Sequence, residues 1–433
     1  MFSHIFSSSG RGLAGFALGI FLFSCVPTSV AEAAPAIAST VVKPANSIGE
    51  FKEALAFTGI TFKGASKNLS QRYPYTWALV ENQKLSMAAY QALKSFTYEH
   101  VSISGRKLDR DSGHKYALAL MIDKELVLVE RFRRNTHIPV EGSQKLITAS
   151  KDTCRVRIQL EAQALIFNVK DSQIAASLPM DPMIWHELTD CKNDTSLVND
   201  KISELVAGTD RERPSLIAQF VARIASYKPS SSKMVQIAVT DVTVDKKSDN
   251  FLPPLMQSDA HRELKMFIAN NFIMQLHKNW GVAVQPYLVD ASVIAMQGRF
   301  YGNDATYNLT LPKPAYGVSI NLRGFGRVLH DENKTGQNYL YATAIDFKVK
   351  QLGGMTRNIF ESKVKAAASK FIPVSIGEVQ EWPAYQEALN ILLLSVTREI
   401  HDPDTLFHKA QGFSRKQLKQ IVDLEKAYKA CRI

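Results

Sequence analysis

Residues 155–169 read RVRIQLEAQALIFNV, and this alternation of polar and apolar residues decides the fold class. One face would carry Arg155, Arg157, Gln159, Glu161 and Gln163, and the other Val156, Ile158, Leu160, Ala162 and Ala164. Because successive strand side chains point to opposite faces of a sheet, the pattern predicts a half-buried antiparallel strand with a solvent-facing polar side. Residues 170–173 (KDSQ) predict a turn into a return strand at 174–178.

A helix and a further strand region precede this strand. Apolar residues at helical spacing predict a helix that begins near Leu85 and includes Leu93. The apolar run 116–132 follows, and its interruption at Asp123 and Lys124 predicts a hairpin.

The second half repeats this order of elements. A helix is predicted over 258–279, with Ser258 as N-cap and Gly281 after its end. Alternating strands follow at 316–329 and 339–350. The sequence therefore predicts an α+β fold of two helix-on-antiparallel-sheet modules in tandem, with a helical C-terminal segment. Two unrelated domains are the alternative.

Composition shifts and linkers predict the domain boundaries. The chain divides into a signal peptide (1–33), a leading arm (34–75), a first module (76–200), a helix and linker (201–233), a second module (234–375) and C-terminal helices (376–433). The clearest linker is the segment KPSSSK at 228–233.

The first residues predict export. The apolar run 13–23 is too short to cross a bilayer, and Ala31-Glu32-Ala33 offers a cleavage site after Ala33. We therefore expect a cleaved signal peptide and a periplasmic or secreted protein of a bacterial envelope. An uncleaved anchor and a lipoprotein attached at Cys25 are the alternatives.

The net charge of +11 favours contact with polyanions or anionic lipid. An exported location makes nucleic acid the least suitable partner, so none is predicted. The candidate binding cations are Arg155, Arg157, Arg323, Arg327, Lys348 and Lys350 on strands, and Arg415, Lys416 and Lys419 on the basic amphipathic helix 414–431. A charge that serves only solubility or strand protection is the alternative.

The cysteines fit an oxidising compartment. Cys154 and Cys191 are predicted to form a disulfide, which would leave Cys431 free. Three reduced thiols are the alternative.

The search for chemistry returns no catalytic residue, metal site or cofactor. Residues 185–190 (WHELTD) resemble a zinc-protease motif, but Asp190 stands where the second histidine belongs. Residues 323–327 (RGFGR) lack the pattern of a phosphate loop, and 109–114 (DRDSGH) lack the distal glutamate of a calcium loop.

These observations favour a non-enzymatic accessory protein that binds an envelope protein partner through its tandem modules, with exposed strand edges as the means. One alternative is a secreted hydrolase whose site only the fold assembles. The other is binding of anionic lipid or a polyanion through the basic C-terminal helix. The oligomeric state is not predicted.

Overall fold

Two β-sheets organise the chain, and the predicted α+β class is confirmed. The computed structural model describes residues 53–63, 69–81, 84–105, 115–139, 146–189, 194–208, 213–229, 235–289, 293–300, 303–374, 381–402 and 404–432. These residues belong to one compact unit that spans 50–433. The predicted signal peptide lies outside them and stays a prediction.

The large sheet has eight strands. Its order is β5-β4-β3-β1-β8-β9, with β2 paired to β1 and β6 paired to β4. The strands are β1 (Glu53–Lys63), β2 (Val101–Ser104), β3 (Tyr116–Pro139), β4 (Leu146–Asn168), β5 (Ile174–Pro179), β6 (Met183–Thr189), β8 (Val293–Phe300) and β9 (Asn303–Thr310). β1 runs parallel to β2 and β3, so the sheet is mixed, whereas we expected antiparallel pairing throughout.

Two parts of the large sheet come from unexpected places in the sequence. β1 lies within the range of the predicted leading arm, yet it pairs with β3 on one side and β8 on the other. The β8–β9 hairpin lies within the range of the second module, yet it completes the first sheet. Hydrogen bonding between strands therefore crosses the sequence boundary between the two halves.

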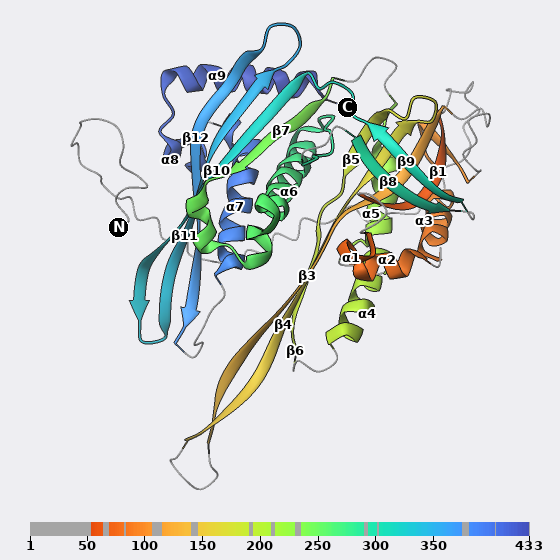
Figure 1. The fold of residues 1–433 in the computed structure, drawn as a ribbon. Coiled ribbons are helices and arrows are strands. Elements are labelled where there is room, and N and C mark those ends of the chain that lie inside the picture. Colours follow the sequence, from red (N-terminus) through yellow and green to blue (C-terminus); the bar gives the residue numbers. More distant parts are fainter. Residues whose placement is uncertain are drawn as a thin grey trace, which may run out of the picture. The chain divides into compact units, whose positions relative to one another are not determined.

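Five helices cover one face of the large sheet: α1 (Leu69–Arg72), α2 (Pro74–Glu81), α3 (Lys84–Lys94), α4 (Asp194–Ala207) and α5 (Leu216–Ser226) (Figure 1). The predicted apolar face of β4 faces this layer, and Val156, Ile158 and Leu160 are fully buried there with Phe220 of α5. This half of the strand prediction is confirmed.

The polar face of β4 is buried as well, so the predicted solvent-facing side is wrong at its centre. Gln159, Glu161 and Gln163 are only 1%, 7% and 4% exposed. Helices α6 (Pro254–Trp280) and α7 (Trp382–Thr397) supply partners for this face through Asn270 and Gln386. Alternation in the sequence indicates that the two faces of a strand differ in polarity, but it does not indicate whether solvent or another element covers the polar face.

The predicted hairpin at Asp123 and Lys124 is also wrong. β3 continues for 24 residues and pairs with β4 as far as Pro139. The ladder shifts register between Ile122 and Lys124, which makes Asp123 a β-bulge. A bulge leaves one residue out of the ladder and can redirect its side chain without ending the strand.

The small sheet has the order β12-β11-β10-β7, with β7 parallel to β10. Its strands are β7 (Ile237–Val244), β10 (Tyr316–Asn333), β11 (Gly336–Gln351) and β12 (Arg357–Pro373). α6, α7 and α9 (Arg415–Ala430) pack against it, while α8 (Leu406–Gln411) and two short 3₁₀ turns, η2 (Lys246–Phe251) and η3 (Glu399–His401), complete the fold. α6 also contacts β5 of the large sheet, so this helix links the two sheets.

Two helix boundaries test the sequence signals. Gly281 ends α6 in the left-handed conformation (φ 60°), as the sequence predicts. The helix begins at Pro254, four residues before the predicted N-cap Ser258, because proline suits a first helical turn. Within the described residues, no helix is both long and apolar enough to span a bilayer.

Candidate functional site

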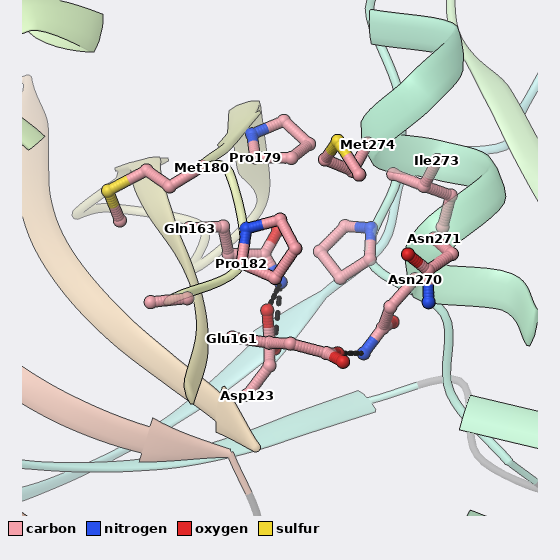
Figure 2. A pocket seen from close by; sticks show the side chains of 12 residues that line it. Asp123, Glu161, Gln163, Pro179, Met180, Pro182, Asn270, Asn271, Ile273 and Met274 are labelled. Atoms are coloured by element: carbon pink, nitrogen blue, oxygen red, sulfur yellow. Dashed lines mark hydrogen bonds between the residues drawn. The ribbon is translucent and has the colours of Figure 1, made fainter. Parts of the chain in front are cut away.

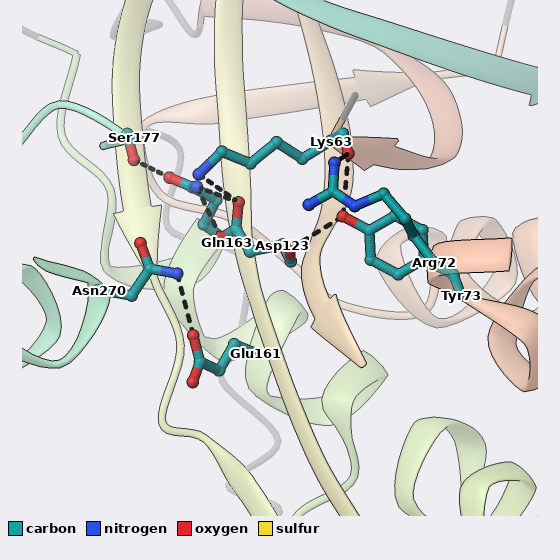
Figure 3. Close-up of polar contacts among 8 residues, drawn as sticks. All are labelled: Lys63, Arg72, Tyr73, Asp123, Glu161, Gln163, Ser177 and Asn270. Carbon is teal, nitrogen blue, oxygen red and sulfur yellow. Dashed lines mark hydrogen bonds and ion pairs between the residues drawn. The ribbon is translucent and has the colours of Figure 1, made fainter. Parts of the chain in front are cut away.

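A group of polar side chains, all buried except the partly buried Asn270, lies between β1, β3, β4, β5 and α6 (Figure 3). We call it the polar cluster, and it consists of Lys63, Asp123, Glu161, Gln163, Ser177 and Asn270. Polar groups inside a protein are stable only when they are paired, so each contact in this cluster matters for the fold.

Asp123 is the centre of one half of the polar cluster. Gln163 donates its amide to both carboxylate oxygens at 2.8 and 2.7 Å, and Lys63 Nζ lies 3.6 Å from Oδ1. The hydroxyl of Ser177 donates to the other end of the Gln163 amide, which fixes its orientation. Burial raises the pKa of Asp123 above its ordinary value, although the Lys63 ammonium and the Gln163 hydrogen bond oppose this shift.

Glu161 is the centre of the other half. Its carboxylate accepts hydrogen bonds from Gln159 at 2.7 Å and from Asn270 at 2.9 Å. Lys124 lies opposite Glu161 in the β3–β4 ladder. The buried Lys124 Nζ has no hydrogen-bond partner among the described residues and lies 5.2 Å from the centre of the Phe267 ring. Two lysines therefore accompany two carboxylates, and the buried charges balance.

Glu125, next to this cluster, caps a distant helix. Its carboxylate accepts from the backbone N–H of Tyr75 at 3.0 Å, and from Thr76 N–H at 2.7 Å and Thr76 Oγ1 at 2.5 Å. These donors lie in the first turn of α2, where backbone N–H groups lack helical partners. Burial raises the pKa of Glu125, while the hydrogen bonds from Thr76 favour the charged form.

A small cavity adjoins the polar cluster (Figure 2). It has a volume of about 30 Å³, and Asp123, Glu161, Gln163, Asn270 and Met274 are among its lining residues. One water needs roughly 10–15 Å³ of such space, so the cavity has room for about two. It therefore offers no place for the organic substrate that the hydrolase alternative requires.

Sequence reasoning missed the polar cluster, although a signal was present. The charged triplet Asp123-Lys124-Glu125 interrupts an otherwise apolar run, and Asn270 lies between Met266 and Met274 on the same side of α6. A charged residue inside an apolar segment indicates either a turn or a buried polar contact. Only the second interpretation fits this strand.

The predicted strand cations are divided between the two sheets. Arg155 and Arg157 lie on β4, whereas the other four lie on β10 and β11 of the small sheet. Three of those four have acidic partners: Arg323 with Asp245 (3.3 Å) and Asp346 (3.2 Å), Lys348 with Glu361 (2.8 Å), and Arg327 with Glu381. Lys350 is partly exposed on β11. The fold thus does not gather the six on one sheet, and a shared anion-binding groove stays a prediction.

The predicted cations of the last helix are arranged differently. Arg415, Lys416 and Lys419 are all exposed on the first half of α9, and none has an ion pair with another described residue. Ser414 caps the helix, and the Gln417 side chain accepts a hydrogen bond from the Ser414 backbone N–H, which completes a capping box. These three cations are therefore available to a negatively charged partner.

The predicted disulfide involves one described residue. Cys154 is fully buried on β4 and lies opposite Thr189 of β6, two positions before Cys191. Cys191 lies outside the described residues, so the pairing stays a prediction. Cys431 is a free, buried thiol, and burial raises its pKa to about 12.

The metal-like motifs gain no support. His186 and Glu187 are neighbours on the strand β6, so they point to opposite faces, whereas a zinc-protease motif needs a helix. Asp190 and residues 109–114 lie outside the described residues. Elsewhere in the described chain, no three histidine, cysteine, aspartate or glutamate residues are grouped to hold a metal ion.

The outer edge of the small sheet is a second candidate site. At Lys365 of β12, the Gln411 side chain accepts from the backbone N–H at 3.0 Å and donates to the backbone carbonyl at 2.9 Å. The backbone of Lys365 therefore points away from β11. Because this direction alternates along a strand, the N–H and C=O groups of Ala367, Ser369 and Phe371 also point outward.

Beyond Gln411 this edge is uncovered by the described residues. Ala367, Ser369 and Phe371 are exposed, and no hydrogen bond to their outward backbone groups occurs within the described chain. Val328 and Val374 near this end of the sheet are exposed too. A strand edge with unpaired backbone and apolar neighbours is a template for an additional strand.

Comparison with known proteins gives little further information. No protein family and no curated protein matches the chain. Among solved structures, a hypothetical protein from Chlamydia trachomatis is similar, with 10% sequence identity and a TM-score of 0.22 over 46% of this chain and 98% of that one. This level of similarity carries no information about function.

Proposed function

We propose that the chain is an exported, non-enzymatic accessory protein of a bacterial envelope that binds a protein partner at the β12 edge. The observation that carries the proposal is the run of outward backbone groups at Ala367, Ser369 and Phe371, which no described residue covers. A partner strand added there would complete hydrogen bonds that the sheet leaves open.

The chemistry of the edge supports one kind of partner. Residues 362–374 read SKVKAAASKFIPV and contain three lysines and no acidic residue. Exposed Phe371 and Val374 add apolar surface beside them. An extended segment in which acidic and apolar residues alternate would complement both features.

A second copy of this chain is a poorer partner for the same edge. Lysines on an edge strand are a common protection against pairing between identical edges. Gln411 and the packing of α9 on β12 also shorten the edge that is open to a long strand. We therefore propose a heterologous partner.

The polar cluster has a structural role in this proposal. It joins β4 of the large sheet to α6, the helix that packs on the small sheet. Its cavity of about 30 Å³ suits water rather than a substrate. Both features support a binding protein over the hydrolase alternative.

Site-specific photo-crosslinking in the native host tests the proposal. A photoreactive residue at Ser369 should crosslink to an extended segment of one extracytoplasmic protein, identified by mass spectrometry of the joined peptides. Ala367→Pro removes an outward N–H that the sheet does not use, so it should abolish the crosslink and leave the fold intact.

Ala367→Ser is the matched control, because it keeps the N–H and should keep the crosslink. Equal crosslinking by the Ala367→Pro variant would overturn the proposal that the backbone edge binds the partner. Amino-terminal sequencing of the native protein tests export separately, and a product that begins at Met1 in the cytosol would contradict it.

A further inference from the structure

We infer that the β11–β12 turn and the first half of α9 form a surface that docks on an anionic lipid bilayer. This inference does not depend on the proposed partner edge. The two sites use different residues: the turn precedes Arg357, which starts β12 ten positions before Ala367, and α9 contacts this strand through Gln417, which donates to Ser362.

The apolar part of this surface consists of three exposed side chains. Met355 in the turn is 92% exposed, and Leu418 and Val422 on α9 are 40% and 50% exposed. Leu418 and Val422 are four residues apart, so they lie on one side of the helix. A water-exposed methionine and two aliphatic residues are suited to the boundary between headgroups and acyl chains.

An ion pair holds the turn against the helix. Arg357 Nη2 lies 3.1 Å from Asp423 Oδ2, and these residues are two positions from Met355 and one position from Val422. Gly354 takes a positive φ of 71°, which lets the chain turn tightly just before Met355. Figure 1 shows α9 beside β12. The turn and the helix therefore contribute to one surface.

This surface carries an excess of unpaired positive charge among the described residues. The acidic residues of α9 are already neutralised, because Asp423 contacts Arg357 and Lys426, and Glu425 lies 2.6 Å from Lys429. Arg415, Lys416 and Lys419 keep their charge without such a partner among the described residues. Exposed cations beside exposed apolar groups are the combination that anionic lipid surfaces attract.

The opposite side of α9 is already used by the fold. Ile421, Leu424 and Tyr428 are buried in the core that α6 and α7 share. The helix is thus a fixed platform, and its exposed residues are free of any role in that core. The exposed side of α9 would contact the bilayer surface while its buried side stays packed in the protein core.

The size of the apolar patch favours lipid over protein. Three separated side chains bury far less than the roughly 1,200 Å² of a stable protein interface. A lipid surface needs no such area when charge attraction accompanies shallow apolar contact. We therefore assign the surface to anionic lipid.

Vesicle co-sedimentation of the purified full-length mature protein tests this inference. The protein should bind vesicles with about 30% phosphatidylglycerol in phosphatidylcholine, and binding should fall steeply as salt rises from about 50 mM to about 500 mM. It should not bind vesicles of phosphatidylcholine alone. Absence of binding to the anionic vesicles would overturn the inference.

Two double variants locate the surface. Lys416→Gln/Lys419→Gln should weaken binding about tenfold or more, since each cation near an anionic bilayer contributes about fivefold. Leu418→Ser/Val422→Ser should also weaken it, and circular dichroism should confirm that α9 remains folded. Lys170→Gln/Lys334→Gln removes the same charge from exposed sites on other turns and should change binding little. Equal losses in this control would show a non-specific charge effect and overturn the assignment to α9.

Discussion

Asn270 of α6 donates a hydrogen bond of 2.9 Å to Glu161 of β4, although 109 residues separate them in the chain. The bond joins a helix that packs on the small sheet to β4 of the large one. It also shows why the polar side chains at the centre of β4 have little solvent exposure: a helix from the second half of the chain lies over them.

This contact should contribute measurably to stability. Asn270→Ala removes a donor from a buried carboxylate, so we expect the free energy of unfolding to fall by about 1–3 kcal/mol. Urea unfolding measures the change. Asn358→Ala, on the exposed start of β12, should cost less than about 0.5 kcal/mol. Similar small losses in both variants would contradict a structural role for the Asn270–Glu161 bond.

The buried Lys63–Asp123 pair should be sensitive to removal of one partner. Lys63→Met leaves the Asp123 carboxylate buried without its cation, and we expect a loss of about 3–5 kcal/mol. Adding Asp123→Asn should restore part of the loss, because the uncompensated charge is then gone. Lys348→Met, which removes a partly exposed pair with Glu361, should cost about 1 kcal/mol or less. If the double variant is no more stable than Lys63→Met, charge is not the cause.

His401 should make the fold sensitive to acid. It lies between Trp280 and Tyr428, with ring centroids 4.7 and 5.5 Å away, and neither ring nitrogen has a described hydrogen-bond partner. Burial lowers its pKa from 6.5 to about 4. Between these values the unfolded chain binds the proton and the folded one does not. Stability from this residue is therefore complete above about pH 6.5 and falls as the pH approaches 4, by about 1–3 kcal/mol.

His401→Phe isolates that effect, because it keeps an aromatic ring and removes the titration. Its free energy of unfolding, measured by urea denaturation from pH 4 to pH 7, should change less with pH than that of the wild type. Parallel curves for the two proteins would show that other groups cause the acid sensitivity.

The cysteines give a chemical test of the predicted bridge and of export. Denatured but unreduced native protein should react with iodoacetamide at Cys431 alone, and after reduction also at Cys154 and Cys191. In the folded protein Cys431 should react slowly, because it is buried and its pKa is raised to about 12. Mass spectrometry counts the labels. Labelling of Cys154 without reduction would exclude the bridge.

The elements of the fold were largely predictable from local patterns. Apolar residues at helical spacing located α3, helix-end signals located α6, the amphipathic pattern located α9, and alternation located β4, β10 and β11. Such patterns arise within a few neighbouring residues, so they need no knowledge of distant contacts. Gly281 and Ser414 likewise mark helix ends through their own backbone and side-chain chemistry.

The polar cluster was not predictable in the same way. Lys63, Asp123, Glu161 and Asn270 come from four separate elements, and each looks like a surface residue in its own segment. The bulge that places Asp123 is an interruption that resembles a turn in sequence. The ion pairs of the strand cations were not predictable for a related reason: the acidic partners of Arg323 and Lys348 lie on other strands.

The sequence by itself determined the α+β class, the order of most elements and the basic character of α9. These properties depend on periodicity and composition, which are local. Tertiary structure alone decided that β1 and the β8–β9 hairpin share one sheet, that the polar face of β4 is buried, and that β12 leaves part of its edge open. Those outcomes depend on contacts between elements that are distant in the sequence, and the pattern of neighbouring residues does not specify such contacts.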